Sequence, residues 1–178
     1  MVPLGSQAPD FSLPDTVTGK EFTLQDLKSD KATVIMFICN HCPFVKHINH
    51  ELVRLAKDYI PKGVSVIAIS SNDVKNYPDD APDKMKIHAE KEGYPFPYLY
   101  DETQKVAKAY DAACTPDFYI YDGSLNLAYR GQLDDSRPKS DVPVTGKDIR
   151  AALDAMLAGN PVSSEQKPSV GCNIKWLV

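Results

Sequence analysis

One junction near residue 40 constrains the fold of this chain more than any other feature. Residues 33–38 (Thr-Val-Ile-Met-Phe-Ile) form a β-rich, apolar run, which is typical of a strand buried on both faces. Two cysteines follow, and from Pro43 to Ile60 apolar side chains recur at helical spacing, which predicts one long amphipathic helix. A second buried strand is predicted over 64–69, so the unit predicts a right-handed crossover between parallel strands.

Weaker patterns extend this unit in both directions. Alternating polar and apolar residues on either side of Thr18-Gly19 predict a hairpin near the amino terminus. Further on, the patterns predict helices over 82–91, 102–110 and 147–157, a short strand over 97–99, and paired strands over 117–121 and 125–130. Together these elements predict a single α/β domain, residues 1–178, around a mixed sheet. Its parts are an N-terminal extension (1–30), a core (31–158) and a C-terminal tail without clear periodicity (159–178).

Composition and charge exclude several classes of function. The 178 residues carry 20 Lys and Arg against 24 Asp and Glu, a net charge of −4, so nucleic-acid binding through phosphate neutralisation is not expected. The apolar runs are far shorter than the roughly 20 residues of a membrane span, and the first residues lack the features of a secretory signal. We therefore expect a cytoplasmic protein that does not enter a membrane. In such a reducing compartment, the four cysteines are more often reactive, metal-binding or simply buried than paired in structural disulfides.

The segment Cys39-Asn40-His41-Cys42-Pro43 marks where chemistry is expected, because it lies at the carboxyl end of a buried strand. Proline is tolerated at the first position of a helix, so Pro43 makes Cys42 the N-cap. There the free N–H groups and the positive end of the helix dipole favour the thiolate. Lys46 and His41 add positive potential. Cys39 has two open interpretations, as the redox partner of Cys42 or as a small side chain packed at the strand end.

A second informative segment, Cys114-Thr115-Pro116, directly precedes a predicted strand. A proline at this place is confined to the start or edge of the strand, and it is a candidate for a cis peptide bond. An isolated Thr-Pro bond is usually trans, so the segment alone leaves the isomer open.

Several motifs together resemble a known family. Ala8-Pro9-Asp10-Phe11, the strand–cysteine–helix junction, Thr115-Pro116 and the Asp122-Gly123 turn resemble a peroxiredoxin-like protein of the thioredoxin-like superfamily, the redoxin or alkyl hydroperoxide reductase/thiol-specific antioxidant kind. The resemblance implies a three-layer thioredoxin-like fold with a central mixed sheet. It also implies a cis Thr115–Pro116 bond facing the nucleophilic cysteine, with Cys114 either near the active face or buried as a small residue.

The chain departs from the catalytic patterns of these relatives. Val45 stands where thioredoxin has its second cysteine, His41 replaces the tryptophan before the first, and Met36 replaces a buried acid. Peroxiredoxins carry threonine three residues before the peroxidatic cysteine, and here that residue is Cys39. Neither full catalytic set is therefore present.

The leading hypothesis is a thiol oxidoreductase in which the Cys42 thiolate attacks a protein or small-molecule disulfide, or a hydroperoxide. The resulting mixed disulfide or sulfenic acid needs a second thiol, and the candidates for it are Cys39, Cys114 and Cys172. The residues expected to line the site are His41, Pro43, Lys46, Thr115 and Pro116. A thiol reductant is the expected partner, no cofactor is implied, and a homodimer is compatible with the sequence.

Two alternatives differ from this hypothesis in class. The domain could be a non-catalytic thioredoxin-fold binding module that uses the groove beside Pro116 without turnover. Metal binding through Cys39 and Cys42, together with His47 and His50, is disfavoured because zinc fingers place far more chain between their cysteine and histidine pairs. No metal site is therefore predicted.

Overall fold

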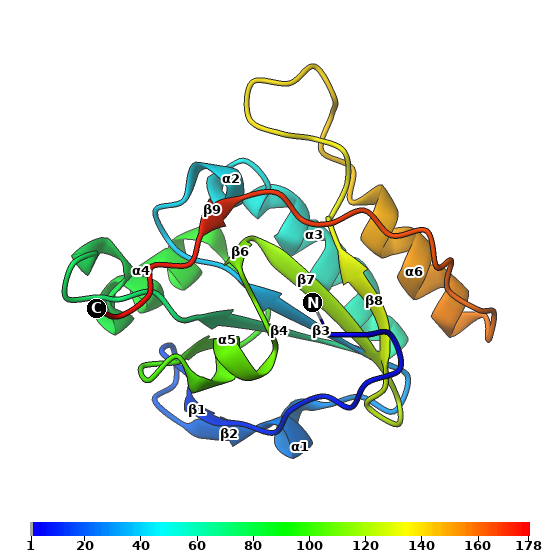
Figure 1. The fold of residues 1–178 in the computed structure, drawn as a ribbon, viewed down its shortest axis with the longest axis horizontal. Coiled ribbons are helices and arrows are strands. Elements are labelled where there is room, and N and C mark those ends of the chain that lie inside the picture. The colour runs from blue at the N-terminus through cyan, green and yellow to red at the C-terminus, as the bar shows by residue number, and fades with distance from the viewer. Residues whose placement is uncertain (1) are drawn as a thin grey trace.

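The computed structural model describes residues 2–178 and shows a central sheet with helices on both faces (Figure 1). The strands of this sheet are β3 (Ala32–Phe37), β4 (Val64–Ser70), β5 (Tyr98–Tyr100), β7 (Asp117–Asp122) and β8 (Leu127–Gly131). They follow the order β5-β4-β3-β7-β8 across the sheet. β3, β4 and β5 run parallel, whereas β7 pairs antiparallel with both β3 and β8. The predicted α/β class and mixed sheet are confirmed.

All six residues of β3 are buried, and their side chains point alternately to the two faces of the sheet. Val34 and Met36 belong to one core, and Ile35 and Phe37 belong to the opposite one, as the period of two along a strand requires. The helices on the first face are α2 (Pro43–Lys46), α3 (Asn49–Tyr59), α4 (Pro82–Glu92) and α6 (Lys147–Leu157). The opposite face is covered by α5 (Lys105–Ala109) and the N-terminal extension. None of the helices within residues 2–178 has the length and apolar character of a membrane span.

The N-terminal extension forms the predicted hairpin and packs under the sheet. β1 (Ser12–Pro14) pairs antiparallel with β2 (Glu21–Thr23). The short helix α1 (Leu24–Leu27) follows, and Thr23 and Asp26 close a capping box at its start. Leu24 is fully buried in the core that contains Ile35 and Phe37, and this burial ties the extension to the sheet.

The prediction of one continuous helix over Pro43–Ile60 is wrong, because the structure divides it into α2 and α3. Ile48 has φ −110° and ψ 0°, which departs from helical geometry. Its side chain is buried, and its amide donates to the carbonyl oxygen of Val45 in a tight turn. Asn49 is buried as well, and its side-chain oxygen accepts a hydrogen bond of 2.7 Å from the Tyr94 hydroxyl. Tertiary contacts of two consecutive residues thus override the helical pattern.

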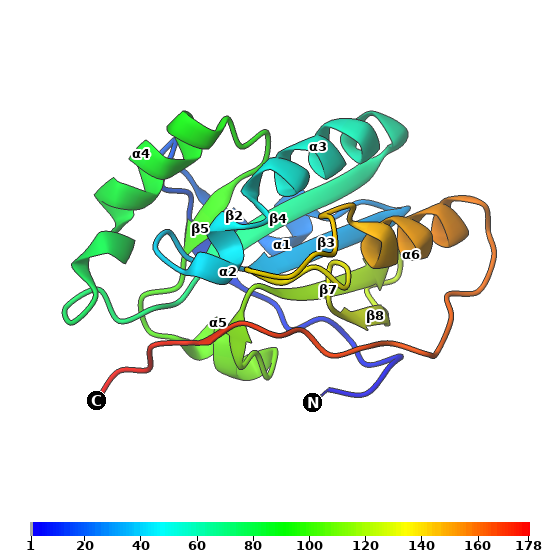
Figure 2. The same cartoon turned by 90° about the horizontal axis from the view of Figure 1, so that it is seen from above.

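The tail contains a strand that its sequence pattern does not predict. β9 (Cys172–Asn173) pairs antiparallel with β6 (Cys114–Thr115), so that Cys172 lies opposite Thr115. In Figure 1 the tail leaves α6, crosses one end of the sheet and reaches β9 between α2 and β6, and Figure 2 shows the same path from above. Near its end lies Trp176, which is 39% exposed and has the Lys108 ammonium 5.8 Å from its ring.

Candidate active site

The site forms where β3 ends and α2 begins. Cys42 is the N-cap of α2 and Pro43 lies in its first turn, as the sequence predicts. However, α2 has only four residues, so it lacks the long row of aligned peptide dipoles that a continuous helix would supply. A Cys42 thiolate therefore depends on individual hydrogen bonds for its stabilisation.

Cys42 is completely covered and faces two other segments of the chain. Its side chain is 0% exposed. Its sulfur lies 2.7 Å from the Cys172 sulfur of β9 and 3.4 Å from the carbonyl oxygen of Thr115. Thr115 precedes Pro116, and the peptide bond between them is cis. The tail and the Thr115–Pro116 segment thus converge on the predicted nucleophile.

Cys39 contacts Cys42 from the interior of the protein. Its side chain is buried, and its sulfur lies 3.5 Å from the Thr115 hydroxyl oxygen. The hydrogen bond from Cys39 is the largest of the effects that lower the pKa of Cys42 to about 4, and burial opposes it. Smaller contributions come from Cys172, the Val45 amide and the Thr115 side chain. The contact with Cys42 and burial together raise the pKa of Cys39 far above its ordinary value, so the shared proton resides on Cys39.

The two remaining cysteines differ in position. Cys172 is partly exposed, and burial raises its pKa to about 11, with a further contribution from the hydrogen bond to Cys42. Cys114 lies on the opposite side of β6 from Thr115, because neighbouring residues of a strand point in opposite directions. Its sulfur faces the carbonyl oxygens of Pro116 at 3.5 Å and Ser169 at 3.9 Å, and burial raises its pKa to about 12. The structure therefore brings Cys172, rather than Cys114, to Cys42.

His41 pairs with a buried acid from the loop before α4. His41 Nδ1 lies 2.6 Å from a carboxylate oxygen of Asp80, and the imidazole ring stacks on Tyr77 with 5.9 Å between the centroids. Asp80 is fully buried and also accepts hydrogen bonds of 2.9 Å from the Asn40 amide and the Asn72 side chain. His41 is thus held in place at the edge of the site.

The three basic residues that follow Pro43 do not contact the cysteines of the site. Lys46 is exposed, and it is not among the groups that act most strongly on the pKa of Cys42. His47 Nε2 lies 2.7 Å from the Ser136 hydroxyl, and His50 is exposed. The prediction that Lys46 adds positive potential at the thiol is therefore not supported, and the two histidines do not join Cys39 and Cys42 in a metal-ligand set.

A different set of metal-ligand residue types does come together in the described part of the chain. Three possible ligand atoms lie within 4.8 Å of one another, one from each of Cys39, His41 and Asp80. However, both oxygens of the Asp80 carboxylate already accept hydrogen bonds, one from the Asn40 amide and one from the Asn72 side chain, and the second oxygen also lies 2.6 Å from His41 Nδ1. These partners account for the position of the buried carboxylate without an ion.

Comparison with protein families places the chain among known proteins. Residues 4–130 match the AhpC/TSA family, a stretch that includes the segment from β1 to β7. The chain belongs to the AhpC/TSA family. No curated protein matches it.

Solved structures extend the comparison for this AhpC/TSA-family chain. An uncharacterized conserved protein from Geobacillus kaustophilus is 68% identical with a TM-score of 0.98, and the match covers 99% of this chain and 94% of that one. A hypothetical protein from Sinorhizobium meliloti 1021 is 48% identical with a TM-score of 0.97, over 100% and 97% of the two chains. The thioredoxin domain of a thiol-disulfide oxidoreductase from Bacteroides vulgatus is 18% identical with a TM-score of 0.62, over 73% and 89%. This last likeness shows a shared thioredoxin-like fold.

Asp80 and Asn72 are the site residues of this family member that sequence patterns do not reveal. Both lie in a loop rich in Asn, Asp and Pro, where polar residues are expected for their turn-forming properties alone. The one signal for Asp80 is its position shortly before Pro82, which predicts a role at the start of a helix rather than a partner for His41.

Proposed function

We propose that this chain is a thiol oxidoreductase in which Cys42 is the attacking thiolate and Cys172 the resolving cysteine. The observation that carries the proposal is the separation of 2.7 Å between the two sulfurs. A disulfide bond measures about 2.05 Å, so only a small approach of the side chains is needed to form one. The pKa of Cys42, about 4, keeps this sulfur ionised at neutral pH.

Reaction with a disulfide takes two exchange steps. The Cys42 thiolate attacks one sulfur of the partner disulfide, which forms a mixed disulfide and releases the other partner sulfur as a thiolate. Cys172 then passes its proton to that thiolate and attacks the Cys42 sulfur. This forms the Cys42–Cys172 disulfide and releases the second partner sulfur. The partner gains two electrons, and an external dithiol reductant returns the chain to its reduced form.

Cys39 has a supporting role in this proposal rather than that of a redox partner. Its protonated thiol donates a hydrogen bond to Cys42, which stabilises the thiolate both when it attacks and when it leaves. Cys39 also occupies the position at which peroxiredoxins carry threonine, and a threonine hydroxyl is a hydrogen-bond donor too.

Two observations support a disulfide, protein-borne or small, as the substrate. The backbone of β6 beside Cys42 can pair with an extended segment, as its pairing with β9 demonstrates. The similar fold from Bacteroides vulgatus belongs to a thiol-disulfide oxidoreductase. We place this chemistry in the cytoplasm, where the cysteines of a chain are more often reactive or buried thiols than structural disulfides.

A hydroperoxide is the second candidate substrate, and the match to the AhpC/TSA family favours it. Its reaction would transfer one oxygen to Cys42 as a sulfenic acid and release an alcohol or water. Cys172 would then condense with the sulfenic acid, release water and form the same disulfide. A binding module without turnover is disfavoured, because it has no need of an ionised thiol.

Three serine variants test the proposal, with dithiothreitol as the reductant and either oxidised glutathione or hydrogen peroxide as the substrate. The turnover rate of Cys42→Ser should be lower than that of the wild type by a factor of at least about a hundred, since a serine hydroxyl does not ionise at neutral pH. Cys172→Ser, reduced, freed of dithiothreitol and then given oxidised glutathione alone, should stop with glutathione attached to Cys42, which mass spectrometry detects. Cys114→Ser serves as the matched control and should retain the wild-type rate. Turnover by Cys42→Ser with both substrates would refute the assignment.

A further inference from the structure

We infer that residues 168–177, here called the strap, form a displaceable cover that must leave β6 before Cys42 meets a disulfide, and that the return of the strap delivers Cys172. The inference rests on the proposed function of Cys42. It assigns the tail a mechanical part in the reaction, beyond supplying a second thiol.

The strap blocks access to Cys42. Cys42 is 0% exposed, and the strap residue Cys172 lies directly against its sulfur. The backbone edge of β6 that faces the site is occupied by β9. A disulfide must approach the attacking sulfur in line with its own S–S bond, and the position for that approach is filled by Cys172 in the closed structure.

The strap is held to the body of the protein by non-covalent contacts. Ile174 is its apolar anchor, with 1% of its side chain exposed and its amide donating to the carbonyl oxygen of Ala113 at 3.1 Å. The Lys175 amide donates to the Asn72 side chain at 2.8 Å, and the Gln104 side chain donates to the Lys175 carbonyl oxygen at 2.9 Å. These are non-covalent contacts of a short segment, and water can replace the polar ones, so local opening is inexpensive compared with global unfolding.

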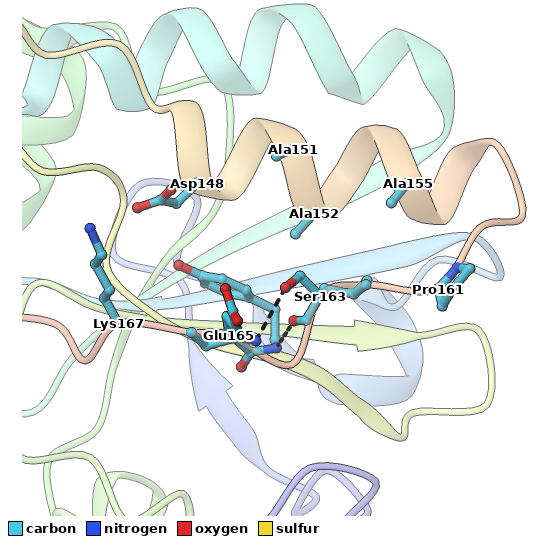
Figure 3. Close-up of a pocket in the computed structure, with 11 residues that line it drawn as sticks. Asp148, Ala151, Ala152, Ala155, Pro161, Ser163, Glu165 and Lys167 are labelled. Atoms are coloured by element: carbon cyan, nitrogen blue, oxygen red, sulfur yellow. Dashed lines mark hydrogen bonds between the residues drawn. The ribbon is translucent and has the colours of Figure 1, made fainter.

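The chain just before the strap contacts the body of the protein on one side only. A cavity of about 340 Å³ lies between α6 and the segment 161–167 (Figure 3). The helix side of this cavity presents the short side chains of Ala151, Ala152 and Ala155. On its other side this segment is held to β8, because the Arg130 amide donates to the Gln166 side-chain oxygen at 3.0 Å and the Gln132 amide donates to the Lys167 carbonyl oxygen at 2.9 Å. We therefore place the start of the moving part after Lys167.

Gly171 determines how closely the strap can lie on β6. A Cβ atom at this position would come within 2.0 Å of the Thr115 carbonyl oxygen, which belongs to the backbone and cannot turn aside. The neighbouring residue, Val170, is 49% exposed. Gly171→Ala should therefore hold the strap away from β6, whereas Val170→Ala should leave it in place.

Strap movement also orders the redox steps. With the strap open, the Cys42 thiolate exchanges with the partner disulfide and remains joined to one partner sulfur. When the strap closes, Cys172 attacks Cys42 Sγ, the Cys42–partner bond breaks and the partner sulfur leaves as a thiolate. Formation of the Cys42–Cys172 bond then fixes the strap in its closed position until a dithiol reduces it.

The test measures the alkylation rate of Cys42 by iodoacetamide in the reduced full-length chain, with peptide mapping by mass spectrometry. Gly171→Ala should raise the rate by about tenfold or more, which corresponds to a shift of the opening equilibrium by about 1.4 kcal/mol. Val170→Ala should stay within about twofold of the wild type. In the wild type, the Ile174 amide should exchange its hydrogen faster in the reduced chain than in the oxidised chain, because the disulfide holds the strap closed.

Two results would overturn the strap as a cover. One is an unchanged alkylation rate in Gly171→Ala although the Ile174 amide has lost its protection from exchange. The other is equal protection of this amide in the reduced and oxidised wild type. Faster alkylation of Gly171→Ala with the pH profile of an ordinary thiol would support the strap and reject the ionised Cys42, so the two proposals fail separately.

Discussion

Replacing Cys39 by alanine tests how the protein stabilises a thiolate without a long helix behind it. The structure attributes the low pKa of Cys42, about 4, first to the hydrogen bond from Cys39. A hydrogen bond to a charged group is worth about 1.5–3 kcal/mol, and one pH unit of pKa corresponds to about 1.4 kcal/mol. Cys39→Ala should therefore raise the pKa of Cys42 by about one to two pH units, to a value still below that of a free thiol.

The matched control is Cys39→Ser, which is nearly isosteric and keeps a donor. Cys39→Ser should keep the pKa of Cys42 close to its wild-type value, whereas equal pKa values of Cys42 in the serine and alanine variants would mean that the donor at position 39 has no effect. Both variants are made in a Cys172→Ser background, so that no disulfide forms and the donor on the strap is retained.

The assay is the ultraviolet absorbance of the thiolate as a function of pH, which needs no reagent to reach the buried sulfur. Burial raises the pKa of Cys114 to about 12, so an ionisation in the acid range belongs to Cys42. An unchanged pKa in Cys39→Ala would refute the argument. A pKa that rises equally in Cys39→Ser would also refute it.

Three further predictions concern the disulfide, the pH dependence and the fold. Mild oxidation should join Cys42 to Cys172, and peptide mapping that finds Cys42 joined to Cys39 instead would contradict the geometry. Since folding lowers the pKa of Cys42 from 9.0 to about 4, its contribution to the stability of the reduced chain is fully present above pH 9 and is lost as the pH falls through 4. The midpoint of urea unfolding, compared between wild type and Cys42→Ser at pH 4 and pH 7, should therefore show a larger wild-type advantage at pH 7. Asp134→Ala should lower the free energy of unfolding by about 2 kcal/mol, because two amides just before α6 lose the buried carboxylate that accepts their hydrogen bonds, whereas an unchanged urea midpoint would show that water replaces it.

The parts of the site that follow from local rules were predictable from the sequence. Pro43 fixes the start of a helix and so makes Cys42 its N-cap, whatever the rest of the chain does. The buried strands on either side follow from their apolar runs, and α6 begins and ends where its pattern predicts. The resemblance to redoxins added the expectation that Thr115 and Pro116 face the cysteine.

The parts that depend on distant contacts were not predictable. The helical pattern runs through Ile48 without interruption, and the break follows from the burial of Ile48 and from the contact between Asn49 and Tyr94. β9 has two residues, so it carries no period of its own and exists because β6 pairs with it. Cys172, and not Cys114, lies beside Cys42 because of this pairing. No spacing in the sequence encodes it.

The place of Trp176 near the end of the strap gives the molecule a built-in optical reporter. The chain contains one tryptophan, and its indole lies beside the Lys108 ammonium on the body of the protein. Release of the tail would take the ring from this cation into bulk solvent. The wavelength and intensity of its fluorescence would thus follow the open fraction in real time, without any label attached to a cysteine.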